Sequence, residues 1–560
     1  MIRRFFVHLG LIFVFFSATW YILFQFDLVH TATLVEPKPP SPRLAIALLP
    51  LDSRPPCTDY VRQLAAMAEI QVSLPSRDML DNYRQPGDTA RLRSWLLQQA
   101  ARSDAAIISV DMLVHGGLLA SRQGNEHHDD AAATIALLRK IHNELPHVRL
   151  YAFNIIPRLF IADNPLTEKF KPLMSDWAIL QETTLLFENP ADMAKLRKLE
   201  AELPPELIAR YRNLYRSNRQ LNSQLLELVN DGILAGLVLG QDDSAPFGLG
   251  NLERQWLDAA IRRNPLLQNK VFVTRGTDEL ALSLLGQIIA EPGGAKTRVY
   301  VHYTEATTAE RIMPYMPGPL SRTVTEKLAI GNASQTGDVS GADYVLVIHA
   351  GSSLSQSTEM DKTALLVKDW LASGKQVALV DLAADWQAEQ TLLPHLQKKD
   401  VPLHRLIAYA GWNTSSNSIG TAVTQAAMVL YGNRASPAGD PLHRDLQRVS
   451  FLAERLADDW YYQKRFRPVL NTSLQQQNVN PYDLQSARTK TEQRISRQMS
   501  NAFPVLVERE WRNDLFLLPT SEQSAYAIAG WRISASLPWD RTFEIRFEAT
   551  PLPALVKQRQ

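Results

Sequence analysis

Two adjacent carboxylates, Asp242 and Asp243, come directly after an apolar run and carry the strongest chemical signal in the sequence. One of two neighbouring acids can keep a proton and act as a general acid, while the other stays ionised and orients a substrate group. The structural alternatives are a cap on the next helix or a salt bridge to an arginine. We interpret this pair as the leading catalytic candidate.

A second acidic pair, Asp278 and Glu279, stands in the segment RGTDELALSLLG and is also a catalytic candidate. The first turn of a helix favours acids because the helix dipole stabilises negative charge there. A structural role at a helix start is therefore the alternative for this pair.

Basic and polar side chains follow most of the other apolar runs, and we assign them to substrate binding. Arginine holds a carboxylate, phosphate or sulfate through two hydrogen bonds, so the arginines favour a ligand with an anionic group. Their alternative role is to brace loops by pairing with nearby acids. The candidates of this kind are Asp52, Arg54, His115, Arg122, Arg158, Arg275, His302 and Glu305.

Three histidines at the same strand ends are candidate metal ligands. His115, His302 and His349 could join the acids as ligands, but their spacing does not match H-x-x-x-H or a comparable metal motif. Cys57 is the single cysteine, which excludes an internal disulfide framework and a thiolate metal cluster within one chain. The sequence therefore predicts no metal and no other cofactor.

The segment GWNTSSNSIG combines one aromatic ring with two side-chain amides, those of Asn413 and Asn417. The indole face of Trp412 could stack on a sugar ring, and amides pair well with hydroxyl or acetamido groups. The polar residues could equally cap the helix that continues into TAVTQAAMVLYG. We assign Trp412, Asn413 and Asn417 to substrate binding.

Short apolar runs precede these polar groups and predict the elements that position them. Continuous hydrophobicity is typical of strands buried on both faces, and helix-like stretches between the runs indicate a parallel sheet. The predicted class is α/β with a mostly parallel sheet, and a (β/α)8-barrel-like arrangement is favoured over a doubly wound open sheet. In both architectures chemistry lies at the carboxyl ends of the strands. The runs are 44–51, 70–74, 105–112, 148–156, 233–240, 270–276, 297–303, 343–351, 375–383 and 405–412.

The soluble part is predicted to contain an α/β main domain over 44–431 and a C-terminal extension over 432–560. A helical insertion is expected within the main domain at about 158–231. In the extension, amphipathic patterns predict helices, and alternating patterns predict antiparallel strands. The helices are expected at 441–470 and 485–500, and the strands at 526–537 and 542–549.

The first 33 residues are predicted to be a membrane anchor. Residues 5–26 are almost entirely apolar, which is enough to span a bilayer as a helix. Arg3 and Arg4 precede this run, so the N-terminus is expected in the cytoplasm and the soluble domain in the periplasm. A cleaved signal peptide is the alternative. The proline-rich stretch at 34–43 is expected to be an extended linker.

Charge excludes one class of partner. Lys and Arg number 59 against 58 Asp and Glu, which gives a formal net charge of +1. A dedicated nucleic-acid binder needs a strong positive field, so no nucleic-acid partner is predicted. The near-zero net charge is a balance of opposite charges, and acids and arginines gather at the same strand ends. This local mixture indicates a polar ligand that can carry an anionic group.

A set of motifs spread over nearly the whole soluble part resembles the bacterial family of domain of unknown function 4127. The resemblance implies that the C-terminal segment is integral to the unit, but it implies no function. The motifs are PLDSRPP (50–56), HGGLLASR (115–122), GQDDSAPFG (240–248), RGTDE (275–279), AGWNTSSNSIG (410–420), DDWYYQKRFRP (458–468) and LPWDRTFEI (537–545).

The site chemistry is also similar to that of barrel glycosidases that hydrolyse N-acetylhexosaminides with help from the substrate's acetamido group. This analogy implies that Asp243 is the acid, that Asp242 orients the acetamide and that Asn413 holds the sugar. The leading hypothesis is a membrane-tethered envelope protein that hydrolyses glycans. The alternatives are a non-catalytic binder of anionic saccharide or peptidoglycan, and a metal-dependent esterase or deacetylase.

Overall fold

Parallel strands form two separate sheets, one of six strands and one of five. The first contains β3 (Ile70–Ser73), β2 (Leu44–Leu49), β4 (Ala105–Ser109), β5 (Arg149–Ile156), β6 (Gly236–Gln241) and β7 (Val271–Arg275), in that spatial order. The second contains β12 (Ala408–Ala410), β11 (Val377–Leu382), β10 (Tyr344–Ala350), β8 (Thr297–Tyr303) and β9 (Ala333–Thr336). The structure is a computed structural model that describes residues 33–34, 40–123, 128–159, 167–290, 295–351, 357–385, 387–435, 440–508, 511, 516–517 and 525–556.

Both sheets repeat one topology. In each, the first strand in sequence lies between the second and the third, and the later strands follow on the side of the third. This is a doubly wound order, in which the chain reverses its winding direction and leaves a crevice at the carboxyl ends of the strands. The reversal lies between β2 and β4 in the first sheet and between β8 and β10 in the second.

The predicted α/β class and the parallel sheet are confirmed. Each of the ten predicted runs contains a parallel strand. In the described residues the strands pair as two open sheets, each with two edge strands, and not as one ring of eight. Each of the two sheets therefore has the doubly wound open arrangement that was the alternative to the barrel.

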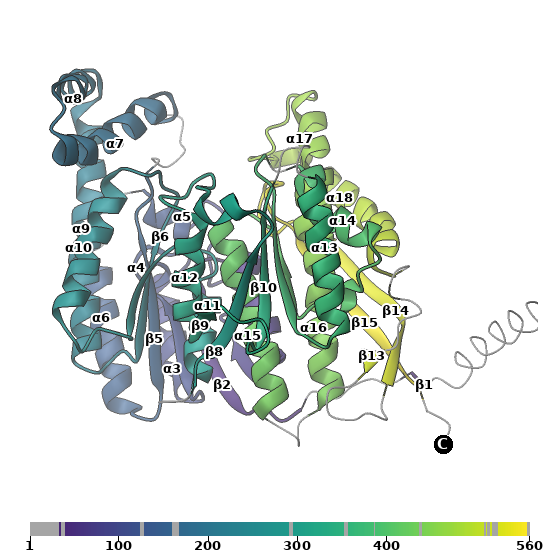
Figure 1. Cartoon of the computed structure of the whole chain (residues 1–560). Helices are drawn as coiled ribbons and strands as arrows, with labels where there is room; N and C mark the ends of the chain where they lie inside the picture. The colour runs from purple at the N-terminus through teal and green to yellow at the C-terminus, as the bar shows by residue number, and fades with distance from the viewer. Residues whose placement is uncertain are drawn as a thin grey trace, which may run out of the picture.

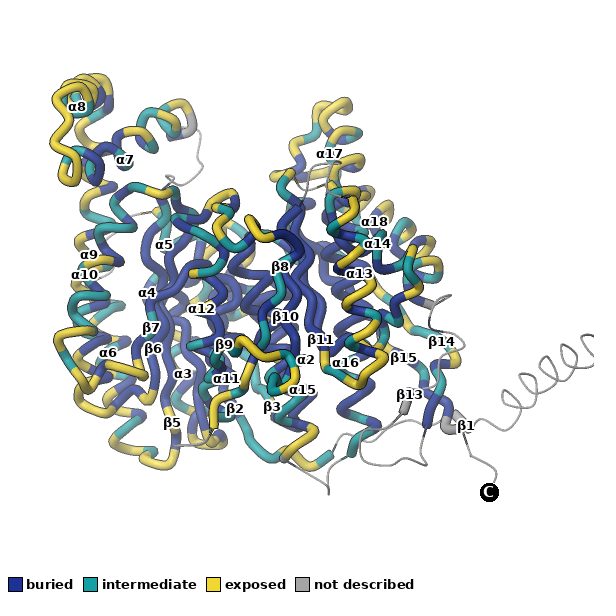
Figure 2. The backbone as a smooth tube through the Cα atoms, in the orientation of Figure 1, coloured by how far each residue is buried: buried dark blue, intermediate teal, exposed yellow. Residues whose placement is uncertain are grey.

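A layer of helices lies between the two sheets and is shared by both (Figure 1). Alternate residues of β2 show why the strands are continuously apolar. Ile46 and Leu48 face the shared layer, whereas Ala47 and Leu49 face the helices on the outer side. The sheets are accordingly buried on both faces (Figure 2). The shared helices are α2 (Asp59–Ala66), α11 (Leu280–Ile289), α12 (Leu320–Ile330) and α15 (Ser415–Ala435).

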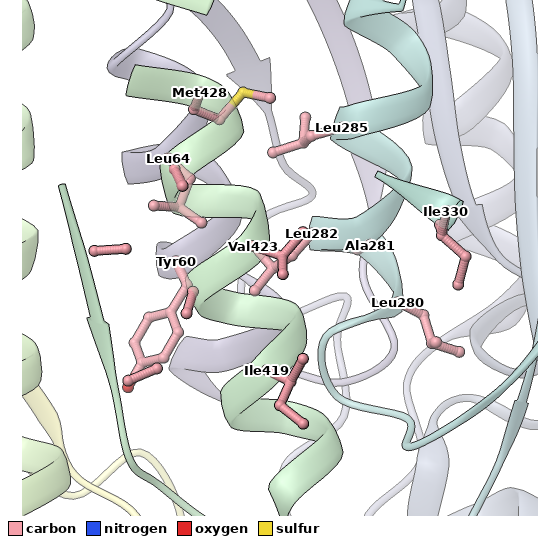
Figure 3. Close-up of a cluster of buried hydrophobic side chains, with 14 of the residues drawn as sticks. Tyr60, Leu64, Leu280, Ala281, Leu282, Leu285, Ile330, Ile419, Val423 and Met428 are labelled. Atoms are coloured by element: carbon pink, nitrogen blue, oxygen red, sulfur yellow. The ribbon is translucent and has the colours of Figure 1, made fainter. Parts of the chain in front are cut away.

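Helix α15 runs through the middle of this shared core (Figure 3). Its Ile419 and Val423 are buried and pack within one cluster with Tyr60 of α2 and Leu282 of α11. Polar side chains at the start of α15 therefore have a fixed position relative to both sheets.

The outer faces of the two sheets carry separate sets of helices. The first sheet is covered by α3 (Thr89–Ala100), α4 (Val110–His115), α6 (His128–Glu144), α9 (Pro205–Asn230) and α10 (Leu249–Arg263), and the short α5 (Leu118–Ser121) contacts α4. The second is covered by α13 (Ser357–Ala372), α14 (Leu393–Lys398), α16 (Pro441–Arg455) and a π-helix, η7 (Leu456–Phe466).

Helices α7 (Lys171–Phe187) and α8 (Pro190–Glu202) lie where the helical insertion was expected and project from the body at the upper left of Figure 1. With α9 they surround a small core of their own that contains Trp177 and Tyr211. Short 3-10 turns complete the main domain: η1 (Pro55–Cys57), η2 (Glu168–Phe170), η3 (Ala306–Glu310), η5 (Ala388–Gln390) and η6 (Leu403–Arg405).

The C-terminal extension packs against the second sheet and adds a four-stranded antiparallel sheet. The predicted pairing of its last two long strands is confirmed, because β14 (Ala525–Ser536) pairs antiparallel with β15 (Arg546–Val556). The shorter strands β1 (Thr33–Leu34) and β13 (Phe516–Leu517) flank them. The helical elements are α17 (Arg467–Gln475), η8 (Gln485–Ala487), α18 (Arg488–Phe503) and the π-helix η9 (Pro504–Glu508).

The predicted anchor at residues 5–26 lies outside the described residues. Within the part of the chain that the structure describes, every helix is too short or too polar to cross a membrane.

Candidate functional site

The carboxylate of Asp278 joins loops from the carboxyl ends of both sheets. Asp278 follows β7, and its Oδ1 accepts a hydrogen bond of 2.8 Å from Nη2 of Arg54, which follows β2. Its Oδ2 accepts hydrogen bonds of 3.2 Å from the side-chain amides of Asn413 and Asn417. Residues that are far apart in the sequence thus meet around one buried carboxylate.

Arg54 lies between two carboxylates. Its Nε and Nη2 bond Asp52 at 3.0 and 2.5 Å, while Nη2 also bonds Asp278. Burial alone would lower the pKa of the Arg54 guanidinium. The negative charges of Asp278 and Asp52 outweigh burial and raise this pKa. The indole of Trp539, from the C-terminal extension, covers the guanidinium, and Cζ of Arg54 lies 4.9 Å from the ring centroid.

The pair that follows β6 is held by two further arginines. Arg122 bonds both oxygens of Asp242 at 2.7 and 2.8 Å, and Nη2 of Arg158 bonds Asp243 at 2.8 Å. The bidentate contact is the geometry in which guanidinium and carboxylate bind most strongly. The salt-bridge alternative predicted for the acids and the arginines is therefore realised.

The two acids of this pair differ electrostatically. Burial alone would raise the pKa of Asp242, but the charges of Arg122 and Arg158 outweigh burial and lower it. Burial and the charge of Asp242 raise the pKa of Asp243, and the charge of Asp278 adds to that rise. The side chain of Asp243 is 28% exposed, whereas that of Asp242 is 3% exposed. Asp243 is thus the acid that a ligand can reach and that holds a proton more readily.

A narrow pocket of about 10 Å³ lies beside Asn413, with room for about one water. Met313 and Pro314 form one wall, and the next residue, Tyr315, accepts a hydrogen bond of 3.2 Å from the backbone N–H of Ser244. This segment therefore connects the pocket with the loop that carries Asp243. Asp243 stands outside the residues that line this pocket, on the rim formed by the strand ends of the first sheet.

Glu279 and Arg275 lie behind this rim. Glu279 and Lys327 form a fully buried ion pair of 2.5 Å, and Glu279 also accepts a hydrogen bond of 3.0 Å from Ser416. Burial lowers the pKa of Arg275 to about 10, and its Nη1 bonds Glu326 at 2.6 Å. These contacts tie α11, α12 and α15 together, so Glu279 occupies a structural position and not the catalytic one expected.

Trp412 does not provide the expected platform for a sugar. Trp412 is only 3% exposed. Its ring packs edge-on against the ring of Tyr60, with 6.1 Å between the ring centroids. Trp412 belongs to the core cluster between the two sheets, to which Tyr60 of α2 also belongs. Trp412 is therefore a core residue in this structure.

The remaining binding candidates lie apart from the acid pair. His302 contacts Thr363 of α13 at 3.4 Å on the outer face of the second sheet, and burial lowers its pKa. Glu305 pairs with Arg311 at 3.4 Å. His115 ends α4, the helix that follows the central strand β4, and the next residue, Gly116, takes a left-handed φ of 79°.

Among the residues that the structure describes, one group of side chains has metal-ligand spacing. Single ligand atoms of Asp52, Cys57 and Asp278 lie within 4.8 Å of one another. Arg54 occupies both carboxylates, and burial raises the pKa of the Cys57 thiol. Because a metal needs the thiolate and free carboxylate oxygens, this conformation favours the ion-pair network over a metal.

Three further site residues were not among the predicted candidates. Oδ1 of Asp81 accepts a bond of 2.7 Å from the backbone N–H of Ser53, and Trp539 donates to the Ser53 hydroxyl at 2.8 Å. Asp111, at the carboxyl end of β4, accepts a bond of 2.9 Å from the N–H of Ile155. Asp111 could have been found because it follows a predicted strand, where site residues are expected. Trp539 could have been found because it belongs to the LPWDRTFEI motif. No local sequence pattern singles out Asp81.

Asp111 makes stability depend on pH. Burial raises its pKa to about 7, above the value of about 3.9 in an unfolded chain. The folded state therefore binds the proton more tightly, and stability should fall as pH rises from about 4 to about 7, by up to about 1.4 kcal/mol per pH unit. We expect Asp111→Asn to remove this loss, so that its free energy of unfolding exceeds that of wild type at pH 8.

Urea titrations at pH 4.5, 6 and 8 measure this effect, with the exposed Asp369→Asn as the control. If wild type and Asp111→Asn show the same pH dependence, the assignment to Asp111 is wrong.

The π-helix η7 fixes the loop that carries Asn413. Oδ2 of Asp459 accepts a bond of 2.9 Å from the N–H of Gly411, and Nζ of Lys464 donates to the carbonyl oxygen of the same residue. Burial raises the pKa of Asp459 to about 6. Both backbone groups of Gly411 are thus held from one element, which gives the DDWYYQKRFRP motif a role in positioning the site.

Gly411→Ala tests this arrangement. A Cβ atom at position 411 would lie 2.6 Å from the carbonyl oxygen of Asp381 and 3.1 Å from Nζ of Lys464. We expect a loss of about 1–3 kcal/mol in the free energy of unfolding, because overpacking forces the loop to move. Gly337→Ala is the matched control, since a Cβ there meets no atom within 4 Å. Equal losses in the two variants in urea titrations would refute the role given to Gly411.

The fold and this network define a class: a two-sheet α/β protein with a charged site at the meeting point of strand ends from both sheets. The chain belongs to the DUF4127 family, described as a protein of unknown function, and matches it over residues 46–548. The match includes η7, β13 and β14 and ends within β15, so it extends into the C-terminal segment, as the motif resemblance implied. A search of curated proteins found no match.

Proposed function

We propose that the protein is a glycan hydrolase in which Asp243 is the general acid. The observation that carries this proposal is the asymmetry of the acid pair. Asp243 is partly exposed and has a raised pKa, whereas Asp242 is buried and has a lowered pKa. Glycosidases commonly separate the roles of two carboxyl groups in this way.

In the proposed reaction, Asp243 donates its proton to the glycosidic oxygen as the bond from that oxygen to the anomeric carbon breaks. The acetamido oxygen of the substrate attacks the anomeric carbon, while the negative charge of Asp242, held in its ion pair with Arg122, stabilises the positive charge that forms on the acetamide. Water then opens the cyclic intermediate and returns a proton to Asp243. No outside oxidant, reductant or metal is needed in this cycle.

The main alternative is a non-catalytic binder of an anionic saccharide or of peptidoglycan. The arginines that suggested an anionic ligand are already paired with carboxylates. An added anion would have to compete with these carboxylates, which disfavours the alternative. The same pairing makes a neutral, hydroxyl-rich ligand the better fit, with Asn413 as a further polar contact at the rim.

The cellular setting of the proposal rests on the sequence. The apolar run at 5–26 and the proline-rich linker at 34–43 would tether the enzyme to the inner membrane. The soluble part would then face the periplasm, where peptidoglycan and exopolysaccharide precursors are available as substrates.

The experiment is product analysis by mass spectrometry after incubation with peptidoglycan-derived and exopolysaccharide-derived oligosaccharides. The proposal predicts shorter oligosaccharides with a newly formed reducing end. Binding without any product would favour the non-catalytic alternative. Loss of an acetyl or ester group with the chain intact, together with bound metal in the purified protein, would favour an esterase or deacetylase.

A further inference from the structure

A second cavity lies at the opposite end of the second sheet. It has a volume of about 530 Å³, within the range of small-molecule sites. Its walls come from the residues just before β11 and β12, from the last turns of α15 and from α16. Val429, an α15 residue that lines the cavity, lies 14 residues after Ser415, so about 21 Å of helix separates the cavity from the start of α15.

The polar wall of this cavity is cationic. Arg405, Arg444 and Arg448 line it together with a single carboxylate, Asp445. Arg448 is committed to Asp445 at 2.6 Å and to two backbone carbonyl groups. Arg405 is exposed and forms no ion pair among the described residues.

Arg444 is the side chain that points most clearly to a ligand. It is 3% exposed, and its Nη1 bonds Glu69 at 2.7 Å. Its Nε and Nη2 are buried and have no hydrogen-bond partner within the described part of the chain. Unsatisfied buried donors on a charged group are costly, and an oxyanion would satisfy both of them.

The rest of the wall is mainly apolar. Met67, Ile407, Val429 and Phe516 contribute aliphatic and aromatic surface next to the arginines. A bare inorganic ion would leave this surface in contact with water, whereas a ligand with an apolar body would cover it.

We infer that this cavity binds an oxyanion that carries an apolar group, with Arg444 and Arg405 on the anionic head. Such a head could belong to a soluble organic phosphate or to the headgroup of an anionic lipid. The site is independent of the proposed hydrolysis because none of its residues contacts the acid pair.

Calorimetric titration of the full chain with phenyl phosphate tests the soluble source, and flotation with vesicles containing phosphatidic acid tests the lipid source. Phenol and vesicles of neutral phosphatidylcholine supply the apolar part without the charge. We expect saturable binding of one anionic probe and none of the neutral probes. Failure of both anionic probes to bind would overturn the inference.

Variants locate the binding. Arg444→Met should weaken it by about tenfold or more, because a buried charged hydrogen bond is lost. Arg405→Ala should weaken it by about threefold, and since Arg405 is exposed, this variant tests the site even if Arg444→Met unfolds. Arg434→Ala is the matched control, because Arg434 is exposed near the end of α15 and pairs with Asp343. Equal weakening by Arg434→Ala would show that binding is non-specific charge attraction and would overturn the site.

Discussion

Asp243→Asn is expected to lower kcat for an unactivated glycoside by about 10²–10⁴-fold, the usual contribution of a general acid. Asparagine has nearly the same shape as aspartate and can keep a hydrogen bond to Arg158, but it has no proton to give. Substrate affinity should therefore change little. In wild type, activity should fall as pH rises through the raised pKa of Asp243, because only the protonated form acts as the acid.

Comparing substrates with different leaving groups distinguishes a general acid from a residue with a structural role. An aryl glycoside with a nitrophenolate leaving group needs little protonation, so Asp243→Asn should retain far more activity on it than on the natural linkage. Asp242→Asn should slow both substrates alike, because the charge of Asp242 stabilises the cationic acetamide whichever group leaves. Asp385→Asn, at an exposed strand end of the second sheet, is the matched control. If Asp243→Asn slows both substrates equally, Asp243 is not the acid.

Lys327→Met is expected to lower the free energy of unfolding by about 3–5 kcal/mol, the usual cost of breaking a buried ion pair by removing one partner. Lys327 and Glu279 both have side chains with 0% exposure. The variant leaves the charge of Glu279 without its cation, and it also removes the bond of 2.6 Å from Nζ of Lys327 to the carbonyl oxygen of Arg275.

A double variant isolates the charge. Lys327→Met combined with Glu279→Gln removes both charges and should recover a large part of the lost stability in urea titrations, because no uncompensated ion remains. A loss below 1 kcal/mol in the single variant, or a double variant that is less stable than the single one, would contradict this structural role for Glu279.

Most strands could be predicted because each carries its own signal. Continuous apolar runs bounded by polar loops marked every parallel strand except β9. Its sequence, ASQT, is polar because the strand lies at the edge of the second sheet. The division into two sheets could not be predicted in the same way, because a run fixes a strand but not the partner with which it pairs.

The site was predictable to the extent that it follows from strand ends. That rule placed Asp52, Arg54, Asp242, Asp243 and Asp278 on one rim, and the structure brings Arg54 and Asp278 into contact across 224 residues of sequence. The position of a residue after a strand does not show whether its side chain is exposed or buried. Trp412 packs against Tyr60 of α2 and Glu279 pairs with Lys327 of α12. Each partner is distant in the chain, so the burial of these two residues leaves no local trace in the sequence.

A crystal structure of the D243N variant with a bound peptidoglycan-derived or exopolysaccharide-derived oligosaccharide that wild type cleaves tests the central claim most directly. The account predicts that the glycosidic oxygen lies about 2.6–3.2 Å from the side chain at position 243, the distance required for proton transfer. It also predicts the acetamide beside Asp242. An oligosaccharide bound away from the acid pair would contradict the account.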